Sequence, residues 1–180
     1  MKTFIASGIA AAALVSAASA DVTFSFTNQT WTGFNFTEAY AAGSLTGTLT
    51  GVSVNATLNA STNYTYADDL CVYINPSPLS TGGLLQVGGF SNLNATQRYS
   101  WANGGSSAPG TTVTGTNTLT TGINMAANPL QSIWIGNGYG AAGTSGTWTG
   151  TITLIGVDVP APGAVALLGL AGFCSRRRRA

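Results

Sequence analysis

Hydrophobic and polar residues alternate one by one along much of the chain. Val22, Phe24 and Phe26 alternate with Thr and Ser, and the same alternation runs through residues 52–58. Because successive side chains of a strand point to opposite faces, this pattern predicts strands with one buried and one exposed face. No stretch between the two ends of the chain shows the period of an amphipathic helix.

The alternation changes phase once, near Thr50 and Gly51. Leu45 and Leu49 are apolar residues at odd-numbered positions, whereas the apolar residues in 52–58 lie at even-numbered positions. A change of phase within a strand predicts a bulge or a bend.

Further apolar segments complete an all-β pattern. Residues 70–74 form a nearly continuous apolar run, which is expected of a central strand. Further strands are expected in the ranges 34–36, 84–87, 111–119, 133–135 and 148–154, each of which contains apolar residues. About eight or nine short strands, separated by segments rich in Gly, Pro, Asn and Ser, predict an antiparallel β-sandwich over residues 21–158.

The first 20 residues have the pattern of a secretory signal peptide. Lys2 precedes an apolar stretch over residues 4–15, and Ala18 and Ala20 form an A-x-A cleavage site. We therefore expect signal peptidase to remove residues 1–20 and the mature chain to begin at Asp21, outside the cytoplasm.

The segment 159–180 has the pattern of a second targeting signal. A Pro-x-Pro sequence precedes about 11 apolar residues at 164–174, or ~17 Å of helix, whereas a stable membrane span needs about 20 residues. The arginines after it would hold the end of the chain on the cytoplasmic side. We expect a short hydrophobic helix that inserts transiently into the membrane during export; the motif residues are Val159, Pro160, Pro162, Arg176, Arg177, Arg178 and Arg179.

This order of motifs resembles the PEP-CTERM sorting signal of bacteria that produce exopolysaccharide. The family usually has Glu at the position of Ala161, so this chain carries a Pro-Ala-Pro variant. The resemblance implies processing by an exosortase-like sorting enzyme and a final location at the cell surface or in the extracellular matrix. The competing signal for a glycolipid anchor ends in a hydrophobic tail, and the terminal arginines argue against it.

Two internal segments loosely resemble the jelly-roll P-domain that follows the protease in convertases. Asp69-Leu70, Pro76-Ser77-Pro78 and Gly146-Thr147-Trp148 match that family's pattern in order. The resemblance implies a jelly-roll-like sandwich and says little about activity.

Composition excludes several function classes. Charged residues make up 6% of the chain, and Arg98 is the single basic residue between Asp21 and Asp158. Nucleic acid is therefore not an expected partner, because it requires a basic patch. The absence of histidine removes the Ser-His triad and the commonest metal ligand. Of the two cysteines, Cys174 lies in the hydrophobic tail, so Cys71 is expected to be a lone buried thiol.

The remaining candidate chemistry concerns the acidic and aromatic residues. Asp68 and Asp69 form the one acidic pair, which would be a calcium site if loop carbonyls completed it. The alternative is a solvated loop in which Asp69 supports a turn or the entry to a strand. Tyr64, Tyr66, Tyr139 and the tryptophans could stack on sugar rings if they are exposed, and Trp101 and Tyr139 are the preferred candidates because they lie in loops. Trp134 and Trp148 are expected in the core.

These observations favour a non-enzymatic, exported β-sandwich with a structural or adhesive role at the cell surface or in the matrix. We assign no catalytic residue and no cofactor. A carbohydrate-binding module for extracellular polysaccharide is the alternative, motivated by the loop aromatics. A polysaccharide-active enzyme is the weakest hypothesis, because a glycosidase needs two carboxylates roughly 5–10 Å apart across a cleft. The acidic residues available for such a pair are Asp21, Glu38, Asp68, Asp69 and Asp158.

Overall fold

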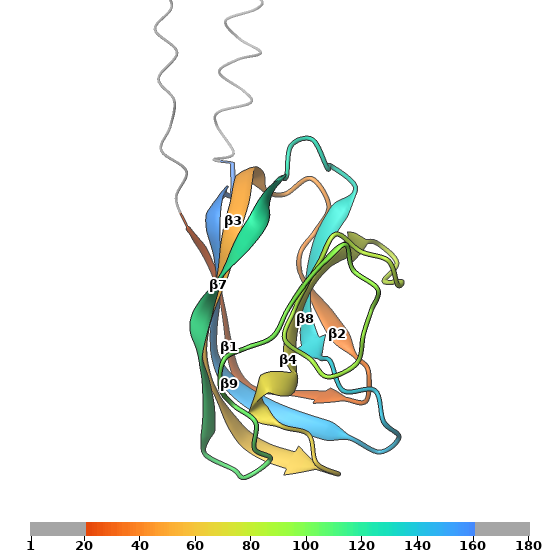
Figure 1. Ribbon diagram of the computed structural model, residues 1–180, viewed down its shortest axis with the longest axis vertical. Coiled ribbons are helices and arrows are strands. Elements are labelled where there is room, and N and C mark those ends of the chain that lie inside the picture. The colour runs from red at the N-terminus through yellow and green to blue at the C-terminus, as the bar shows by residue number, and fades with distance from the viewer. Residues whose placement is uncertain (1–20, 161–180) are drawn as a thin grey trace, which may run out of the picture.

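The computed structural model describes residues 21–160, which form nine β-strands and one short 3-10 helix, η1 (Figure 1). The alternation in the sequence therefore forms strands as expected. Their bounds are β1 Val22–Thr32, β2 Phe36–Tyr40, β3 Thr46–Thr62, η1 Ala67–Asp69, β4 Leu70–Pro76, β5 Leu85–Val87, β6 Gln97–Tyr99, β7 Thr111–Asn124, β8 Gln131–Asn137 and β9 Ser145–Asp158.

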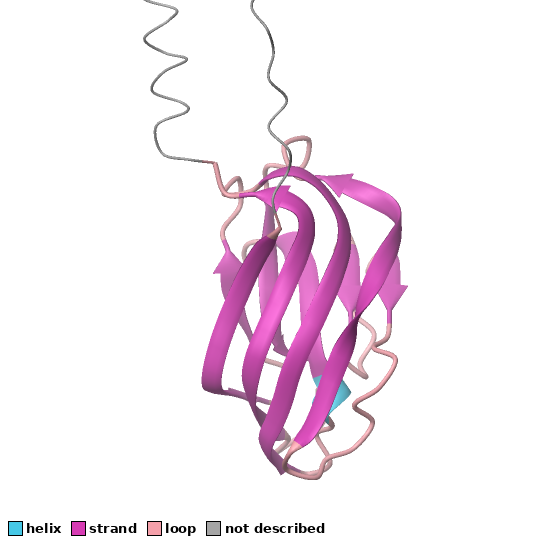
Figure 2. Cartoon of the chain, turned by 90° about the vertical axis from the view of Figure 1, so that its left-hand side faces the viewer, coloured by secondary structure: helices cyan, strands magenta, loops and turns pink. Residues whose placement is uncertain are grey.

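The strands form two sheets that face each other. One sheet has the order β1-β9-β3-β7, and Figure 2 shows its long strands side by side. The other has the order β2-β8-β4-β5-β6. Neighbouring strands are antiparallel, except that β5 and β6 run parallel. The prediction of an all-β fold is confirmed, and the pairing is antiparallel as predicted except between β5 and β6.

The predicted irregularity near Gly51 is also present. The pairing of β3 with β7 shifts register between Leu49 and Gly51, and the pairing of β3 with β9 shifts between Gly47 and Gly51. A bulge inserts an extra residue on one strand. The apolar side chains before and after it can therefore both point inward, although they lie on positions of opposite parity.

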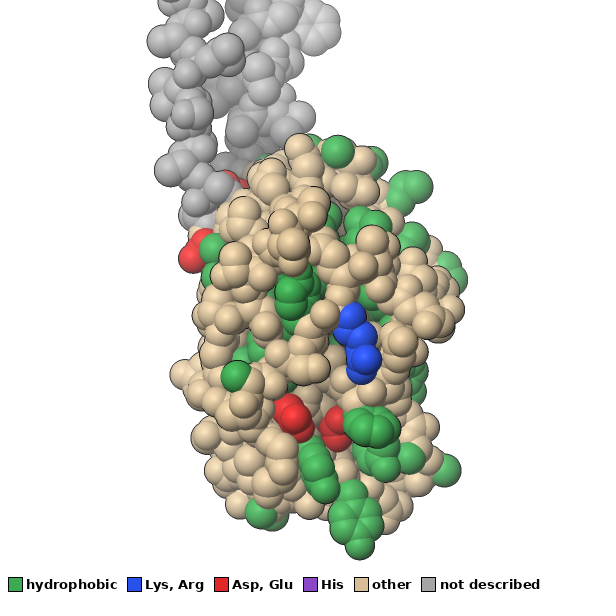
Figure 3. Space-filling model, in the orientation of Figure 1, with side chains coloured by type: hydrophobic (Ala, Val, Ile, Leu, Met, Phe, Trp, Pro, Cys, Tyr) green, Lys and Arg blue, Asp and Glu red, His purple; other side chains and the backbone are tan. Residues whose placement is uncertain are grey.

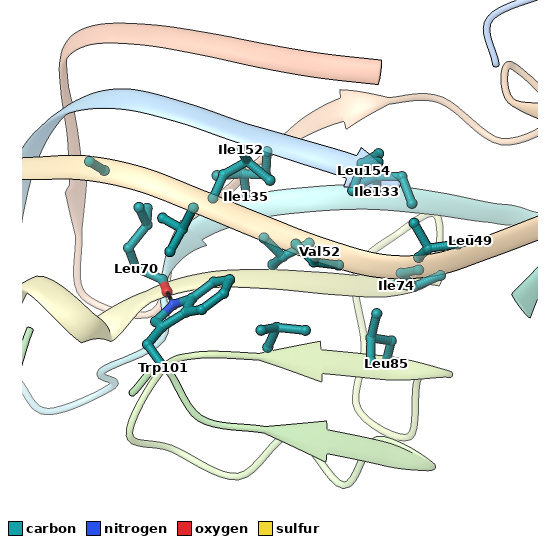
Figure 4. Packing of buried hydrophobic residues seen from close by; sticks show 14 of the residues in the cluster. Leu49, Val52, Leu70, Ile74, Leu85, Trp101, Ile133, Ile135, Ile152 and Leu154 are labelled. Carbon is teal, nitrogen blue, oxygen red and sulfur yellow. Dashed lines mark hydrogen bonds between the residues drawn. The ribbon is translucent and has the colours of Figure 1, made fainter. Parts of the chain in front are cut away.

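The core lies between the two sheets and contains aliphatic side chains from both. Figure 4 shows Leu49 and Val52 of β3 and Ile152 of β9 directed towards Ile74 of β4 and Ile135 of β8. All five side chains are fully buried, with 0% of their surface exposed. Each fully buried side chain of this size contributes about 1.5–3 kcal/mol of hydrophobic stabilisation. This packed core gives the sandwich a rigid structure that supports the loops at its ends.

A second hydrophobic cluster covers the outer face of the sheet β2-β8-β4-β5-β6. It contains Phe36, Cys71, Tyr73 and Leu93. Cys71 is a buried free thiol, as the sequence predicted. Burial raises the pKa of this thiol, so its reactive thiolate form is disfavoured.

Strands β2 and β8 approach so closely that one position requires glycine. A Cβ atom on Gly136 would lie 2.1 Å from the carbonyl oxygen of Asn35 and 2.6 Å from the Cα atom of Phe36. Both obstructing atoms belong to the backbone, so no side-chain movement relieves the clash.

The outer face of the sheet β1-β9-β3-β7 carries many hydroxyl side chains. Hydroxyl groups of Thr23 and Thr153 lie 3.0 Å apart, and those of Thr30 and Thr147 lie 2.7 Å apart, so they are hydrogen-bonded across neighbouring strands. The same four strands bury the aliphatic face described above. This face explains how the chain forms a sandwich with few charged residues.

The first and last described residues lie at the same end of the sandwich (Figure 1). Gly156 in β9 donates its backbone N–H to the Asp21 carboxylate at 3.1 Å. Val159 is 55% exposed just beyond β9. The other targeting residues, which are Ala18, Ala20, Pro162 and Arg176 to Arg179, lie outside the described residues. Within residues 21–160, no helix is long and apolar enough to cross a membrane.

Candidate functional site

Two adjoining hollows lie at the end of the sandwich remote from Asp21 and Pro160. The larger, which we call the acidic pocket, has a volume of about 330 Å³ and is lined by Tyr66, Asp68, Asp69, Gly88, Gly89, Phe90, Arg98, Ser100 and Trp101. The smaller, which we call the aromatic recess, has a volume of about 160 Å³ and is lined by Tyr64, Tyr66, Asp69, Phe90 and Tyr139. Figure 3 shows this surface, with two acidic side chains beside a group of hydrophobic ones and a basic side chain above them.

Segments far apart in the sequence build this site. The tyrosines 64 and 66 follow β3, the two aspartates belong to η1, Phe90 follows β5, and Tyr139 follows β8. Strands β8, β4 and β5 are neighbours in one sheet, so the segments next to them meet at one place. The two tyrosines lie in the connection from β3, in the other sheet, to η1. The backbone of Gly138 donates to the Asp69 carbonyl at 2.8 Å, which joins the loop after β8 to η1.

The Asp69 carboxylate joins the segment that carries Tyr66 to the loop that carries Phe90. Its carboxylate accepts the backbone N–H of Tyr66 at 2.7 Å and that of Phe90 at 3.2 Å. The residue is 5% exposed, so both bonds are shielded from water. Burial is the main cause that raises its pKa from 3.8 to about 6; the Asp68 charge raises it further, and the two N–H groups oppose the shift. Asp69 is thus ionised above pH 6 and fixes the loops that carry the aromatic rings.

Asp68 lies beside it and faces the acidic pocket. Its backbone N–H donates to the Gly104 carbonyl at 3.2 Å, and its carbonyl accepts the Gly89 N–H at 3.0 Å. These bonds position its carboxylate at the pocket wall, where partial burial raises its pKa. A carboxylate in this setting is available to accept hydrogen bonds from ligand hydroxyl or amine groups.

Arg98 is the one basic residue in 21–160. In β6 it lies between Gln97 and Tyr99, whose side chains bond to the edge of β7, so the arginine points to the other side of the strand. Its guanidinium donates to the Phe90 carbonyl at 2.9 Å and to the Gly89 carbonyl at 3.4 Å. Arg98 therefore supports the loop on which Phe90 is exposed.

Trp101 is a candidate for sugar stacking only if its ring is exposed. It is 6% exposed, and its indole N–H donates to the Leu70 carbonyl at 2.7 Å, as Figure 4 shows. A buried ring has no free face on which a sugar can stack, so the condition for Trp101 as a sugar-binding residue is not met. The local sequence predicted a loop, and the residue does lie in one, but the loop folds back and places the indole against β4. Trp148 is in the core as expected, and Trp134 is partly buried.

Tyr139 is partly exposed and lines the aromatic recess. Its ring lies 5.7 Å from that of Phe90, centroid to centroid, with an angle of 84° between the planes. Tyr64, Phe90 and Tyr66 are 77%, 75% and 40% exposed. The sequence analysis missed Phe90. In the sequence, Phe90 follows two glycines in a segment where apolar and polar residues do not alternate. This pattern is typical of a loop and could have marked Phe90 as a loop aromatic.

The arrangement of the acidic pair bears on the calcium hypothesis. Both Asp69 oxygens accept backbone N–H groups. Of the roughly six to eight oxygens that calcium requires, the pair therefore offers mainly those of Asp68. Within residues 21–160 no group of three or more His, Cys, Asp or Glu side chains lies close enough to hold a metal.

The other carboxylates do not line either hollow. Glu38 is exposed on β2, where it pairs with Trp134 of β8, and Asp21 and Asp158 lie at the opposite end of the sandwich. The site thus contains adjacent aspartates but no carboxylate on the opposite wall, which a glycosidase would need.

No protein-family model, curated protein or solved structure matches this chain. The function is therefore argued from the chemistry of the site and from the targeting motifs.

Proposed function

We propose that this chain is an exported β-sandwich that binds extracellular polysaccharide at the cell surface or in the matrix. The observation that carries the proposal is the set of exposed rings around the carboxylates at one end of the sandwich. Tyr64 and Phe90 leave about three-quarters of their surface in water. Such exposure of neighbouring large apolar side chains is typical of ligand and interaction sites.

The chemistry of the site suits a sugar. The C–H face of a pyranose packs on an aromatic ring, while carboxylates accept hydrogen bonds from its hydroxyl groups. The acidic pocket supplies Asp68 as such an acceptor next to the rings. Because Asp69 and Arg98 hold the loops through backbone groups, the rings need little reorganisation on binding. Preorganisation of this kind lowers the entropic cost of binding.

The position of the site supports presentation at a surface. The chain ends of the described domain lie at one end of the sandwich and the hollows at the other (Figures 1 and 3). If the C-terminal segment is the sorting signal, a protein attached through it would direct the site outwards. Signal peptidase and an exosortase-like enzyme are the processing partners that this proposal includes.

The strand order favours a jelly roll as the finer description of the fold. The first, ninth, third and seventh strands form one sheet, and the second, eighth, fourth and fifth lie together in the other. Two interlocked Greek keys produce this order when eight strands divide between two sheets. The sixth strand is an addition at the edge. Function is not decided by this fold, which hosts many activities.

Glycan binding can be tested with the purified full chain on an array of polysaccharides. We expect Phe90→Ala and Tyr64→Ala to weaken binding about tenfold or more, because a stacked ring contributes on the order of 1 kcal/mol beyond its buried area. Leu130→Ala is the matched control, since Leu130 is 73% exposed and lines neither hollow. Equal binding by all variants, or none by the wild type, would contradict the proposal and leave a purely structural role.

The sorting proposal has a separate test. Mass spectrometry of the surface protein should find a C-terminus near Pro162 instead of Ala180. Deleting Arg176 to Arg179 should release more uncleaved protein to the medium, because insertion of each arginine costs about 2.5–3.5 kcal/mol and resists export. Replacing Pro160 and Pro162 with Ala should leave the tail attached. Wild-type surface protein that still ends at Ala180 would refute processing.

A further inference from the structure

The aromatic recess has the form of a cage. The rings of Phe90 and Tyr139 stand at 84° to each other at a centroid distance of 5.7 Å, so they form adjacent walls. Tyr64 and Tyr66 complete the lining together with Asp69. A neutral sugar ring stacks best on one flat face, whereas walls at right angles enclose a compact group. The shape therefore indicates a small projecting group of the ligand.

The charge of the recess indicates the sign of that group. Asp69 is the one charged residue in its lining, and Asp68 lies in the neighbouring pocket. Arg98 does not line the recess, and its guanidinium is bonded to the carbonyls of the Phe90 loop. The faces of aromatic rings carry negative electrostatic potential and attract cations.

Three backbone hydrogen-bond donors beside the recess are already engaged and do not face an anionic ligand. The backbone N–H groups of Tyr66 and Phe90 both donate to Asp69, and that of Tyr139 donates to Asn137. The recess thus presents aromatic ring faces beside the negative charge of Asp69, whose oxygens are held by backbone N–H groups. Ring faces next to a negative charge attract an ammonium group.

We propose that the aromatic recess binds an ammonium group, and that the polysaccharide bound at this site carries free amines on its sugars. The statement about the polysaccharide rests on the proposed function, whereas the assignment of an ammonium site does not. The shared chemistry is a positively charged nitrogen. It could also come from a quaternary ammonium head group, and the test separates the two sources.

The test compares two oligosaccharides of equal length by isothermal titration with the purified full chain. One is an oligomer of glucosamine, and the other is the same oligomer with every amine acetylated. We expect the amine form to bind at least tenfold more tightly. Tetramethylammonium should bind weakly when it is titrated alone. In a competition titration, an excess of it should displace the amine form.

Phe90→Leu is the decisive variant. It keeps an apolar side chain while removing the ring face, and it retains the backbone N–H that Asp69 accepts. It should reduce the preference for the amine form by about 2- to 30-fold, the range expected for a cation on an aromatic face. Leu130→Ala should leave the preference unchanged.

The outcomes distinguish the two proposals. Equal affinity for the amine and acetylated forms would overturn the ammonium assignment and would leave glycan binding intact. Binding of tetramethylammonium in the absence of any glycan binding would support the recess chemistry and refute the polysaccharide as its source. Unchanged preference in Phe90→Leu would overturn the role of the cage.

Discussion

The protein should become more stable, not less, as the pH falls from 7 towards 4. The cause is Asp69, whose pKa is raised from 3.8 to about 6 in the folded state, mainly by burial. A group with a raised pKa binds its proton more tightly in the folded chain than in the unfolded one. Folding is then favoured progressively as the pH falls through 6, and the gain is complete below the unfolded value of 3.8.

The size of the effect follows from the shift. A change of one pKa unit corresponds to about 1.4 kcal/mol, so a rise of about two units has a ceiling of about 3 kcal/mol. Asp69 is 5% exposed, so solvent screening reduces this little. Partial burial also raises the pKa of Asp68, which adds in the same direction. The chain has 5 acidic residues in all, so few other groups can mask the trend.

The assay is urea denaturation of the purified full chain, followed by tryptophan fluorescence at several pH values between 7 and 4. Wild-type protein should gain free energy of unfolding over this range. Asp69→Asn should lose most of that gain, because its side chain does not ionise. The amide of Asn offers one acceptor oxygen to the two N–H groups that Asp69 accepts, so the variant should also carry a loss of stability that does not change with pH.

Asp68→Asn serves as the matched control. It removes the neighbouring charge but keeps both Asp69 hydrogen bonds, so most of the gain should remain. A free energy of unfolding that decreases from pH 7 to pH 4 in the wild type would refute the reasoning. So would an equal gain in Asp69→Asn.

Other substitutions test the frame and the ends of the chain. Gly136→Ala should lower the free energy of unfolding by more than about 3 kcal/mol or prevent folding, because its Cβ would overlap backbone atoms. Gly105→Ala should be tolerated, since the nearest atom to its Cβ lies 4.0 Å away. Denaturant midpoints compare the two variants. Trp101→Phe should lose about 1–3 kcal/mol of stability through the unpaired carbonyl it leaves, and calorimetry measures this loss. Cys71 should resist thiol reagents until the protein unfolds, because it is fully buried; rapid labelling of native protein would contradict its burial. N-terminal sequencing of exported protein should begin at Asp21, and an intact Met1 would disprove signal cleavage.

The candidate site was only partly accessible from the sequence. Asp68, Asp69 and Tyr139 were selected as an acidic pair and a loop aromatic, and they do line the two hollows. Phe90 was missed, because it carries no feature that separates a ligand-facing loop aromatic from an ordinary one. Trp101 was selected by the same loop argument and is buried. Loop composition predicts that a segment lies between strands, but not which way its side chains turn.

The local structure of the chain follows from its amino-acid pattern alone. Alternation of apolar and polar residues has the period of a strand, and this period acts between neighbours along the chain. The all-β character, the buried face of β3 and the bulge beside Gly51 follow from it, since each depends on a few consecutive residues.

Which residues lie together at the site depends on the packing of the two sheets. Tyr64 and Tyr139 are 75 positions apart by their numbering, and they line one recess because β4 pairs with both β8 and β5. The exposure of each ring, the two N–H groups on Asp69 and the burial of Trp101 likewise depend on long-range pairing. Many strand orders satisfy the same alternation. The packing of the whole core selects one of them, and this selection brings the loops together.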